Sequence, residues 1–357
     1  CPLEEADDHF KRLSRWGLKF LRLIITWEAI EHAGPGRYDT QYLDYLEALV
    51  EKAALYDLSL FIDPHEDVWS RFTGGDGAPG WTLEKVGLNP SALHSAGAAF
   101  LHSEYGDPLP KMIWPTNNFK YAAQTMFTLF FAGNVFAPET KIDGAPVQEY
   151  LQEHYFGSLK QVAKRLKKYK NVVGYDTMNE HSPGYVGLGN LNSLKHILPK
   201  NGPTPSPYQG MLFASGYPCS VSFYNPRFLG LVKTGSILVN PEAKSFWLPG
   251  HECPWKTHGV WNDLGSEPTL LEPDYFQKAG GMPARFTPLF LKPFWQRFAK
   301  EIRSIHKDAL IFLSPLPEGG EVNLEPGEIE RAVSSPHWYD NLTLVTKIGR
   351  ASCRDRG

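Results

Sequence analysis

Cysteine is scarce in this sequence, and long apolar runs are missing. The four cysteines are widely separated and form no CxxC pair: Cys1, Cys219, Cys253 and Cys353. This spacing excludes a disulfide framework and a zinc ribbon, and it favours a reducing compartment without identifying it. The longest apolar runs, such as 20–26 and 127–132, are far shorter than the ~20 residues that a transmembrane helix needs.

A large net charge is also absent. Lys and Arg number 36 against 39 Asp and Glu, which leaves a net charge of −3. This balance gives no electrostatic footprint for nucleic acid, so we expect no nucleic-acid partner. Aromatic residues are plentiful, with 10 Trp, 16 Tyr and 21 Phe. They suit the flat apolar faces of a sugar-binding cleft, although a large core rich in Phe explains the composition at least as well.

Segments with strand and helix patterns alternate along the chain. The expected strands end near residues 27, 64, 178, 315 and 336, and the expected helices span 4–16, 41–56, 147–170 and 293–306. This alternation predicts parallel strands joined by helical crossovers. An open doubly wound sheet and a closed barrel both satisfy it.

Polar side chains directly follow several of these strands, and this favours the barrel. The strings are Trp27-Glu28, His65-Glu66-Asp67, Asn179-Glu180 and His337-Trp338-Tyr339. Barrel enzymes keep their active sites at the carboxyl ends of the strands. We therefore predict a (β/α)₈ TIM barrel. A full barrel has eight strands, so we expect pieces of the barrel to be missing at both ends of this chain.

Two stretches interrupt the alternation, and the end of the chain looks foreign. Residues 72–137 contain a Gly-rich loop and an apolar helical segment. Residues 182–291 are rich in Pro, Gly and aromatics, show little periodicity, and are predicted to be a substrate-binding cap inserted after strand four. Residues 348–357 resemble translated adapter DNA, and we predict a non-native tail there.

Glu180 is the first candidate catalytic residue. A carboxyl group at a strand end can protonate the leaving oxygen of a glycoside and later deprotonate water. Asn179 beside it can hydrogen-bond the sugar 2-hydroxyl. The alternative is a solvated Glu at the start of a helix.

His65, Asp67 and Trp69 form a second candidate group. The His and the acid can bracket two adjacent sugar hydroxyls, and Trp69 can offer a stacking face. His65 could equally cap a turn after Pro64.

Three further residues are candidates for orienting a carboxylate. Arg22 lies in mid-strand and should have an anionic partner, which in a barrel would be a catalytic carboxylate, unless the Arg points out between helices. His337 and Tyr339 sit at i and i+2, so both can reach a second carboxylate. Alternatively, these aromatics merely cover the rim of the core.

Neither a metal nor a cofactor is expected. Residues 75–80 match G-x-G-x-x-G, but they do not directly follow a strand and they contain Pro79, so a dinucleotide site is disfavoured. His251, Cys253 and His258 lack both an HExxH motif and an obvious fourth ligand.

Taken together, these strings resemble glycoside hydrolase family 5, and within it the fungal glucosylceramidase and steryl β-glucosidase branch, which is related to the endoglycoceramidases. The resemblance covers roughly residues 1–347 as a partial catalytic barrel. It rests on WEAIEHAGPG (27–36), DPHEDVWSR (63–71), TMNE (177–180) and PHWYD (336–340). The sequence departs from the family at Glu66, where relatives often carry Gln.

The resemblance implies retaining double displacement with Glu180 as the general acid/base. It implies that His65 and Asp67 hold the terminal glucose, and that Arg22, His337 and Tyr339 support a nucleophilic Glu. That Glu ends strand seven in the family, and the resemblance implies that strand one and strands seven and eight lie outside this chain. We therefore expect the fragment to be inactive and poorly stable.

The expected substrate is a glucoside with a lipid aglycone, namely glucosylceramide or a steryl glucoside, reached through a peripheral membrane contact. Two alternatives stay open: a glycosidase for soluble glucosides or glycans, and a non-catalytic carbohydrate- or glycolipid-binding protein.

Overall fold

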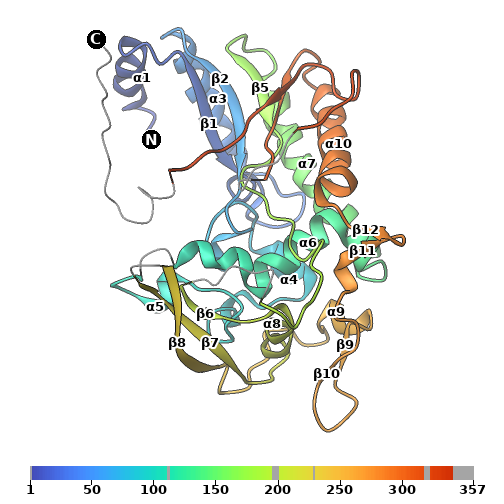
Figure 1. Ribbon diagram of the computed structural model, residues 1–357. Coiled ribbons are helices and arrows are strands. Elements are labelled where there is room, and N and C mark those ends of the chain that lie inside the picture. Colours follow the sequence, from blue (N-terminus) through green and yellow to red (C-terminus); the bar gives the residue numbers. More distant parts are fainter. Residues whose placement is uncertain (1, 111–112, 195–200, 228–229, 317–321, 341–357) are drawn as a thin grey trace, which may run out of the picture.

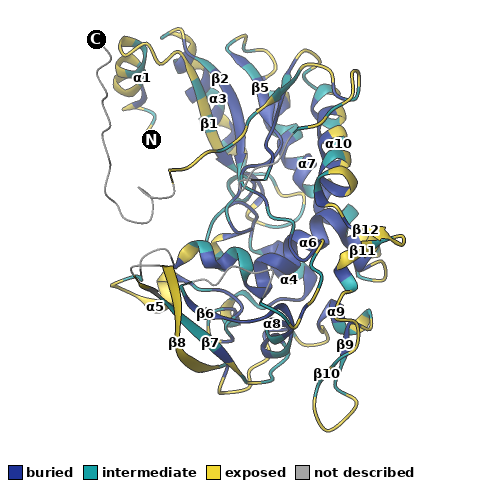
Figure 2. Cartoon of the chain, in the orientation of Figure 1, coloured by how far each residue is buried: buried dark blue, intermediate teal, exposed yellow. Residues whose placement is uncertain are grey.

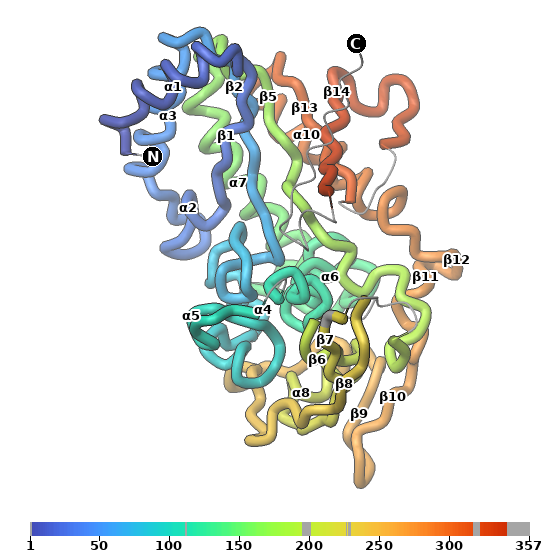
Figure 3. Tube along the Cα trace, turned by 60° about the vertical axis from the view of Figure 1, so that its left-hand side comes forward, coloured from blue at the N-terminus to red at the C-terminus, as the bar shows by residue number. Residues whose placement is uncertain are grey.

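The computed structural model in Figure 1 describes residues 2–110, 113–194, 201–227, 230–316 and 322–340. The predicted tail at 348–357 lies outside these residues. Five parallel strands form the main sheet: β1 (Phe20–Thr26), β2 (Ser59–His65), β5 (Val172–Asp176), β13 (Leu310–Leu313) and β14 (Ala332–Ser334). They lie side by side in chain order, as Figure 3 shows. This order is that of a barrel, because the order of a doubly wound sheet reverses at a switch point.

Helices join these strands as the sequence predicted. They are α1 (Ala6–Arg15), α3 (Thr40–Ala54), α7 (Val147–Leu166) and α10 (Lys292–Arg303). The α3 helix begins where the Asp39 side chain accepts a hydrogen bond from the Tyr42 N–H. It buries Leu43, Leu46 and Val50 on one face, which is the spacing that predicted it.

An aromatic layer fills the inner face of the sheet below the strand ends. The Phe61 and Phe312 rings stack with centroids 4.3 Å apart, and Phe20 lies 5.4 Å from Phe61. Gly174 on β5 lies opposite Phe61 in the sheet. A Cβ at this position would come within 2.2 Å of the Leu310 carbonyl oxygen, so only glycine fits there. The layer separates the apolar base of the barrel from the polar groups at its carboxyl end.

Within the part of the chain that the structure describes, β1 and β14 each pair with one strand, so closure of the barrel is not seen there. The open edge leaves Phe20 and Ile24 of β1 54% and 53% exposed.

A second lobe covers the carboxyl ends of the strands (Figure 1). Residues 71–146 supply η1 (Arg71–Thr73), α4 (Trp81–Val86), η2 (Pro90–Ala92), α5 (His102–Tyr105), η3 (Trp114–Phe119), α6 (Tyr121–Phe136), β3 (Lys141–Ile142) and β4 (Ala145–Pro146). Residues 202–291 supply β6 (Gly202–Thr204), α8 (Pro207–Ala214), β7 (Cys219–Arg227), β8 (Gly230–Val239), α9 (Pro254–Thr257), β9 (Trp261–Asn262), β10 (Thr269–Leu270), η4 (Tyr275–Gln277), β11 (Lys278–Ala279), β12 (Met282–Pro283) and the π-helix η5 (Thr287–Leu291).

The α6 helix joins the two lobes, because it packs on α7 of the barrel and on α8 of the second lobe. Nearly all of its residues are buried, which explains its uniformly apolar sequence. The β7–β8 hairpin was not predicted as regular structure. Its β8 strand is exposed along almost its whole length, so it carries no apolar–polar alternation. None of the helices in the described residues has the length and apolarity to cross a membrane.

The loop that follows β1 is held by one buried carboxylate. It begins with the short helix α2 (Trp27–Glu31), whose first turn is capped by the Thr26 hydroxyl. The fully buried Glu31 accepts hydrogen bonds from Trp27 Nε1 at 2.7 Å and Ser158 Oγ at 2.8 Å, and its Oε1 lies 2.9 Å from His154 Nδ1. These contacts tie the loop to α7.

We predict that Glu31→Ala destabilises the chain by roughly 3–5 kcal/mol, because it leaves buried donors without an acceptor. Urea unfolding followed by tryptophan fluorescence measures the change. The matched control is Glu51→Ala on the exposed face of α3, which should stay within about 0.5 kcal/mol of the unaltered chain. Equal losses for the two variants would contradict this role of Glu31.

Candidate active site

Arg22 is the centre of the polar cluster at the strand ends. Its Nε donates to Asp63 Oδ2 at 2.8 Å, and its Nη2 donates to Asn179 Oδ1 at 2.9 Å. The sequence predicted an anionic partner and identified it as a catalytic carboxylate. Among the described residues the anionic partner is Asp63, a fully buried residue of β2, and a contact with a catalytic carboxylate stays a prediction. Asp63 and His65 lie two positions apart on one strand, so they face the same way, and this spacing could have revealed Asp63.

His65 lies between two carboxylates. Its Nδ1 is 3.1 Å from Asp63 Oδ2, and its Nε2 is 3.5 Å from Asp67 Oδ2. Burial lowers the pKa of His65, but hydrogen bonds and attraction to these two acids outweigh it and raise the pKa to about 10. The imidazole is therefore a cation at neutral pH and donates on both sides. This fixes the orientation of Asp67, whose carboxylate can accept hydrogen bonds from sugar hydroxyls.

Asn179 is held on both sides of its amide. Its Oδ1 accepts from Arg22, and its Nδ2 donates to the Glu66 carbonyl oxygen at 3.0 Å. The residue is 1% exposed. One Nδ2 hydrogen is committed and one remains, so the predicted contact with a sugar 2-hydroxyl stays a prediction that the amide chemistry allows.

Two side chains from the segment after β14 contact the carboxylate of Glu180. His337 Nδ1 lies 2.8 Å from its Oε1, and the Tyr339 hydroxyl donates to the same oxygen. Arg22 Nη1 lies 3.3 Å from His337 Nε2, so this imidazole lies between the guanidinium and Glu180. The sequence predicted that His337 and Tyr339 reach a second carboxylate, the nucleophile, but in this structure both contact Glu180.

These contacts set the protonation state of Glu180. Burial raises the pKa of its carboxyl, but the hydrogen bonds from His337 and Tyr339 lower it further, so the net pKa lies below the ordinary value. Glu180 is therefore ionised at neutral pH in this arrangement. Its backbone has φ +30°, a strained value for a non-glycine residue and one that turns the side chain away from the strand direction.

Trp69 does not offer the stacking face that the sequence predicted. The side chain is fully buried against Trp27 and Phe127, and its Nε1 donates to Thr82 Oγ1 at 3.1 Å. The reason lies in the backbone. Val68 and Trp69 both have positive φ, and this turn directs the indole into the core of the second lobe.

A glycine-rich loop brings an additional acid to the cluster. Asp76 exchanges two backbone hydrogen bonds with Asp67, at 2.9 and 3.2 Å. The loop lies so close that a Cβ on Gly75 would come within 1.8 Å of the Asp67 carbonyl oxygen, and one on Gly77 within 2.2 Å of the Glu66 carboxyl. The G-x-G-x-x-G match at 75–80 thus serves close backbone packing. Sequence reasoning missed Asp76, because only the fold brings it opposite Asp67.

His65, Asp67 and Asp76 each place one ligand atom within 4.8 Å of the others, and theirs is the one trio of metal-binding type among the described residues. The same three groups suit two vicinal hydroxyls of a sugar. Glu28, which also follows a strand, pairs instead with Arg71 at 2.9 Å.

Two buried acids lie behind the cluster without facing solvent. Burial, with repulsion from Asp76 and Asp67, raises the pKa of Glu66 well above its ordinary value, and its Oε1 has no hydrogen-bonding partner among the described residues. Burial, with repulsion from Asp63, raises the pKa of Asp176 to about 7. A protonated Glu66 has the shape and donor capacity of the Gln that the family resemblance leads us to expect there.

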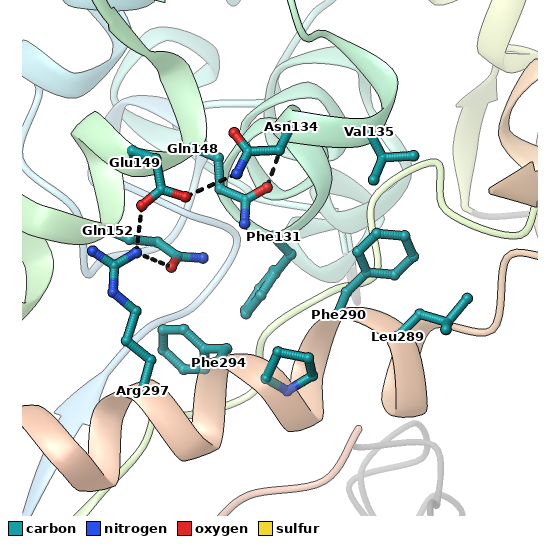
Figure 4. Close-up of a pocket in the computed structure, with 11 residues that line it drawn as sticks. Phe131, Asn134, Val135, Gln148, Glu149, Gln152, Leu289, Phe290, Phe294 and Arg297 are labelled. Atoms are coloured by element: carbon teal, nitrogen blue, oxygen red, sulfur yellow. Dashed lines mark hydrogen bonds and ion pairs between the residues drawn. The ribbon is translucent and has the colours of Figure 1, made fainter. Parts of the chain in front are cut away.

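A separate hollow of about 280 Å³ lies between α6, α7 and α10 (Figure 4). Its polar side chains satisfy one another: Arg297 Nη1 donates to Glu149 at 2.7 Å, and Asn134 Nδ2 donates to the same carboxylate at 2.8 Å. None of the candidate site residues lines it. We therefore place the candidate active site at the strand ends, around Glu180.

Parallel strands in chain order, with a carboxylate and its hydrogen-bonding partners at their carboxyl ends, define a barrel glycoside hydrolase. Residues 2–195 match the model of the cellulase family, glycosyl hydrolase family 5, and the chain belongs to this family. Its fold is accordingly the TIM barrel.

Characterised relatives resemble the chain over nearly its whole length. It is 41% identical to a glucosylceramidase of Rhizopus delemar, over 95% of this chain and 50% of that protein. It is 34% identical to an ergosteryl-β-glucosidase of Saccharomyces cerevisiae, over 97% of this chain and 51% of that protein. The crystal structure of sterylglucosidase 1 from Cryptococcus neoformans superposes with a TM-score of 0.91 at 35% identity, over 96% of this chain and 52% of that one. The chain thus spans about half the length of the relatives it matches.

We predict that Glu66→Gln stabilises the chain at neutral pH by roughly 1–3 kcal/mol, because Gln needs no proton to be neutral in this buried position. The folded-state pKa of Glu66 is raised above its ordinary 4.5, so the folded chain binds the extra proton and loses stability as pH rises above 4.5. The advantage of the variant should therefore grow from pH 4.5 upward.

Thermal unfolding at several pH values tests this, with Glu51→Gln on the exposed face of α3 as control. A stability difference between Glu66→Gln and the unaltered chain that does not change with pH would show that Glu66 does not bind the extra proton.

Proposed function

We propose that this chain forms the acid/base part of a retaining β-glucosidase that acts on glycolipids. The observation that carries the proposal is Glu180, which follows β5, contacts His337 and Tyr339, and lies near the His65–Asp67 pair. A carboxyl group next to groups that can bind vicinal hydroxyls is what hydrolysis of a terminal glucoside requires. Glucosylceramidase and steryl glucosidase relatives support a lipid aglycone.

The mechanism needs a second carboxylate about 5–5.5 Å from Glu180 as nucleophile. Two of the acids nearest the site are paired with other groups: Asp63 with Arg22 and His65, and Asp176 with the Ser314 hydroxyl at 2.9 Å. We propose that the nucleophile comes from outside the described residues. Its negative charge would raise the pKa of Glu180 and keep that carboxyl protonated for the first step.

In the proposed reaction, His65 and Asp67 hold the terminal sugar. The nucleophilic carboxylate bonds to the anomeric carbon as the glycosidic C–O bond breaks, and Glu180 gives its proton to the departing oxygen. Asn179 contacts the 2-hydroxyl as positive charge develops at the anomeric carbon. After the aglycone leaves, the ionised Glu180 takes a proton from water, and the water releases the sugar from the nucleophile. The lowered pKa of Glu180 suits this second step.

The lowered pKa also favours one alternative, non-catalytic binding of a glucoside. A site in which Glu180 stays ionised binds a sugar without cleaving it. A glycosidase for soluble glucosides or glycans would use the same residues with a different aglycone.

We predict that the 357-residue chain binds a cationic glucose-configured iminosugar but releases no glucose from glucosylceramide or a steryl glucoside. Glu180→Gln should weaken iminosugar binding by roughly 10- to 100-fold, because it removes a charge-assisted hydrogen bond. Titration calorimetry measures the affinity, with Glu51→Gln as control. Glucose release by the unaltered chain would refute the assignment of the nucleophile to another segment.

In a longer form of the protein that carries the second carboxylate, Glu180→Gln should lower hydrolysis of glucosylceramide by roughly 10²–10⁴-fold. Hydrolysis of a dinitrophenyl glucoside should fall far less in its first step, since that leaving group needs no proton. Equal losses on both substrates would mean that Glu180 is not the acid, and unchanged turnover would favour the binding alternative.

A further inference from the structure

The β7–β8 hairpin, which comprises Cys219–Arg227 and Gly230–Val239, leaves four aliphatic side chains partly exposed to solvent. Leu231, Val232, Ile237 and Leu238 are 37%, 47%, 43% and 53% exposed. Figure 2 shows β8 exposed along its length, at the edge of the three-stranded sheet β6-β7-β8. A long apolar edge strand is a liability in water unless something covers it.

The apolar side chains lie on both faces of the hairpin. Once the register shift in the β7–β8 pairing is counted, Val232 and Ile237 point to one face, and Leu231 and Leu238 point to the other. A flat protein surface would cover one of these faces. The interfacial region of a lipid bilayer surrounds an inserted hairpin and covers both.

Charge distinguishes this region from the rest of the sequence. No Asp or Glu occurs between Glu180 and Glu242, although the whole chain has 39 of them. The hairpin itself carries the exposed cations Arg227 and Lys233. Although the whole chain has a net charge of −3, the segment 181–241 has a positive net charge, and it includes the exposed aliphatic side chains of the hairpin. Anionic lipid headgroups complement that combination.

We propose that the β7–β8 hairpin docks on a bilayer surface that contains anionic lipids. The inference rests on the proposed function, in which the aglycone is a lipid. The hairpin belongs to the lobe that covers the carboxyl ends of the strands, so docking would hold the entrance of the candidate site at the membrane that contains the substrate (Figure 1).

Co-sedimentation of the 357-residue chain with vesicles tests the proposal without any need for turnover. We expect binding to phosphatidylcholine vesicles that contain phosphatidylserine, and weaker binding to phosphatidylcholine alone. Leu238→Asp should lower the bound fraction about tenfold, since it removes an inserted aliphatic group and adds repulsion. Lys233→Glu should abolish the preference for phosphatidylserine. Leu55→Asp is the matched control, because Leu55 is 77% exposed at the opposite end of the barrel strands.

Three results would overturn the proposal. They are no binding to either vesicle, equal losses in Leu238→Asp and Leu55→Asp, and a concentration-dependent dimer in light scattering that Leu238→Asp disrupts without any effect on vesicles. The last result would assign β8 to a second copy of the chain. Iminosugar binding by the same preparations reports separately on the proposed function, because Leu238 and Lys233 lie outside the candidate active site.

Discussion

A guanidinium group inside a parallel sheet is the constraint on which the candidate site depends. The Arg22 side chain is 31% exposed, and its Nε donates to the fully buried carboxylate of Asp63, so the guanidinium is partly shielded from water and needs an anionic partner. Asp63 on the neighbouring strand β2 supplies the negative charge that pairs with Arg22. Asn179, which follows β5, supplies a carbonyl oxygen that accepts a hydrogen bond from Arg22. Arg22 Nη1 also contacts His337 Nε2, and the other nitrogen of that imidazole, Nδ1, lies 2.8 Å from Glu180 Oε1. One side chain thus links the ends of β1, β2, β5 and β14, and strand order in a barrel is what brings these four ends together.

The same network determines which chemistry the site can perform. The guanidinium of Arg22 pairs with Asp63, and the His65 imidazolium pairs with Asp63 and Asp67. Glu180 in turn receives two donors, which stabilise its ionised form. In this balance Glu180 is a base. A further negative charge nearby would make it an acid, since like charges in one pocket raise each other's pKa. The proposed acid/base role of Glu180 therefore depends on the charges around this residue as well as on the residue itself.

Many of the aromatic and glycine residues in which the chain is rich lie in the second lobe. Its aromatic residues pack mainly with one another around α6, and Trp69 joins them rather than lining the sugar site. Its glycine-rich loop is used for close packing against Glu66 and Asp67, which places Asp76 in the cluster. Its hairpin carries the exposed aliphatic and cationic side chains. The lobe thus contributes Asp76 to the candidate site on its inner side, and it carries exposed aliphatic and cationic side chains on its outer side.

The sequence by itself determined the strands, the long helices and the positions of the polar groups at strand ends, because each depends on local periodicity of apolar residues. It also determined the family, through strings such as those around His65 and Glu180. Only the tertiary structure decided which groups meet. Asp63 as the partner of Arg22, Asp76 beside Asp67, the buried indole of Trp69 and the exposed β8 strand all depend on backbone turns and on contacts between distant segments. Such contacts leave no periodic signal in the sequence, because burial and pairing across the chain are properties of the packed fold.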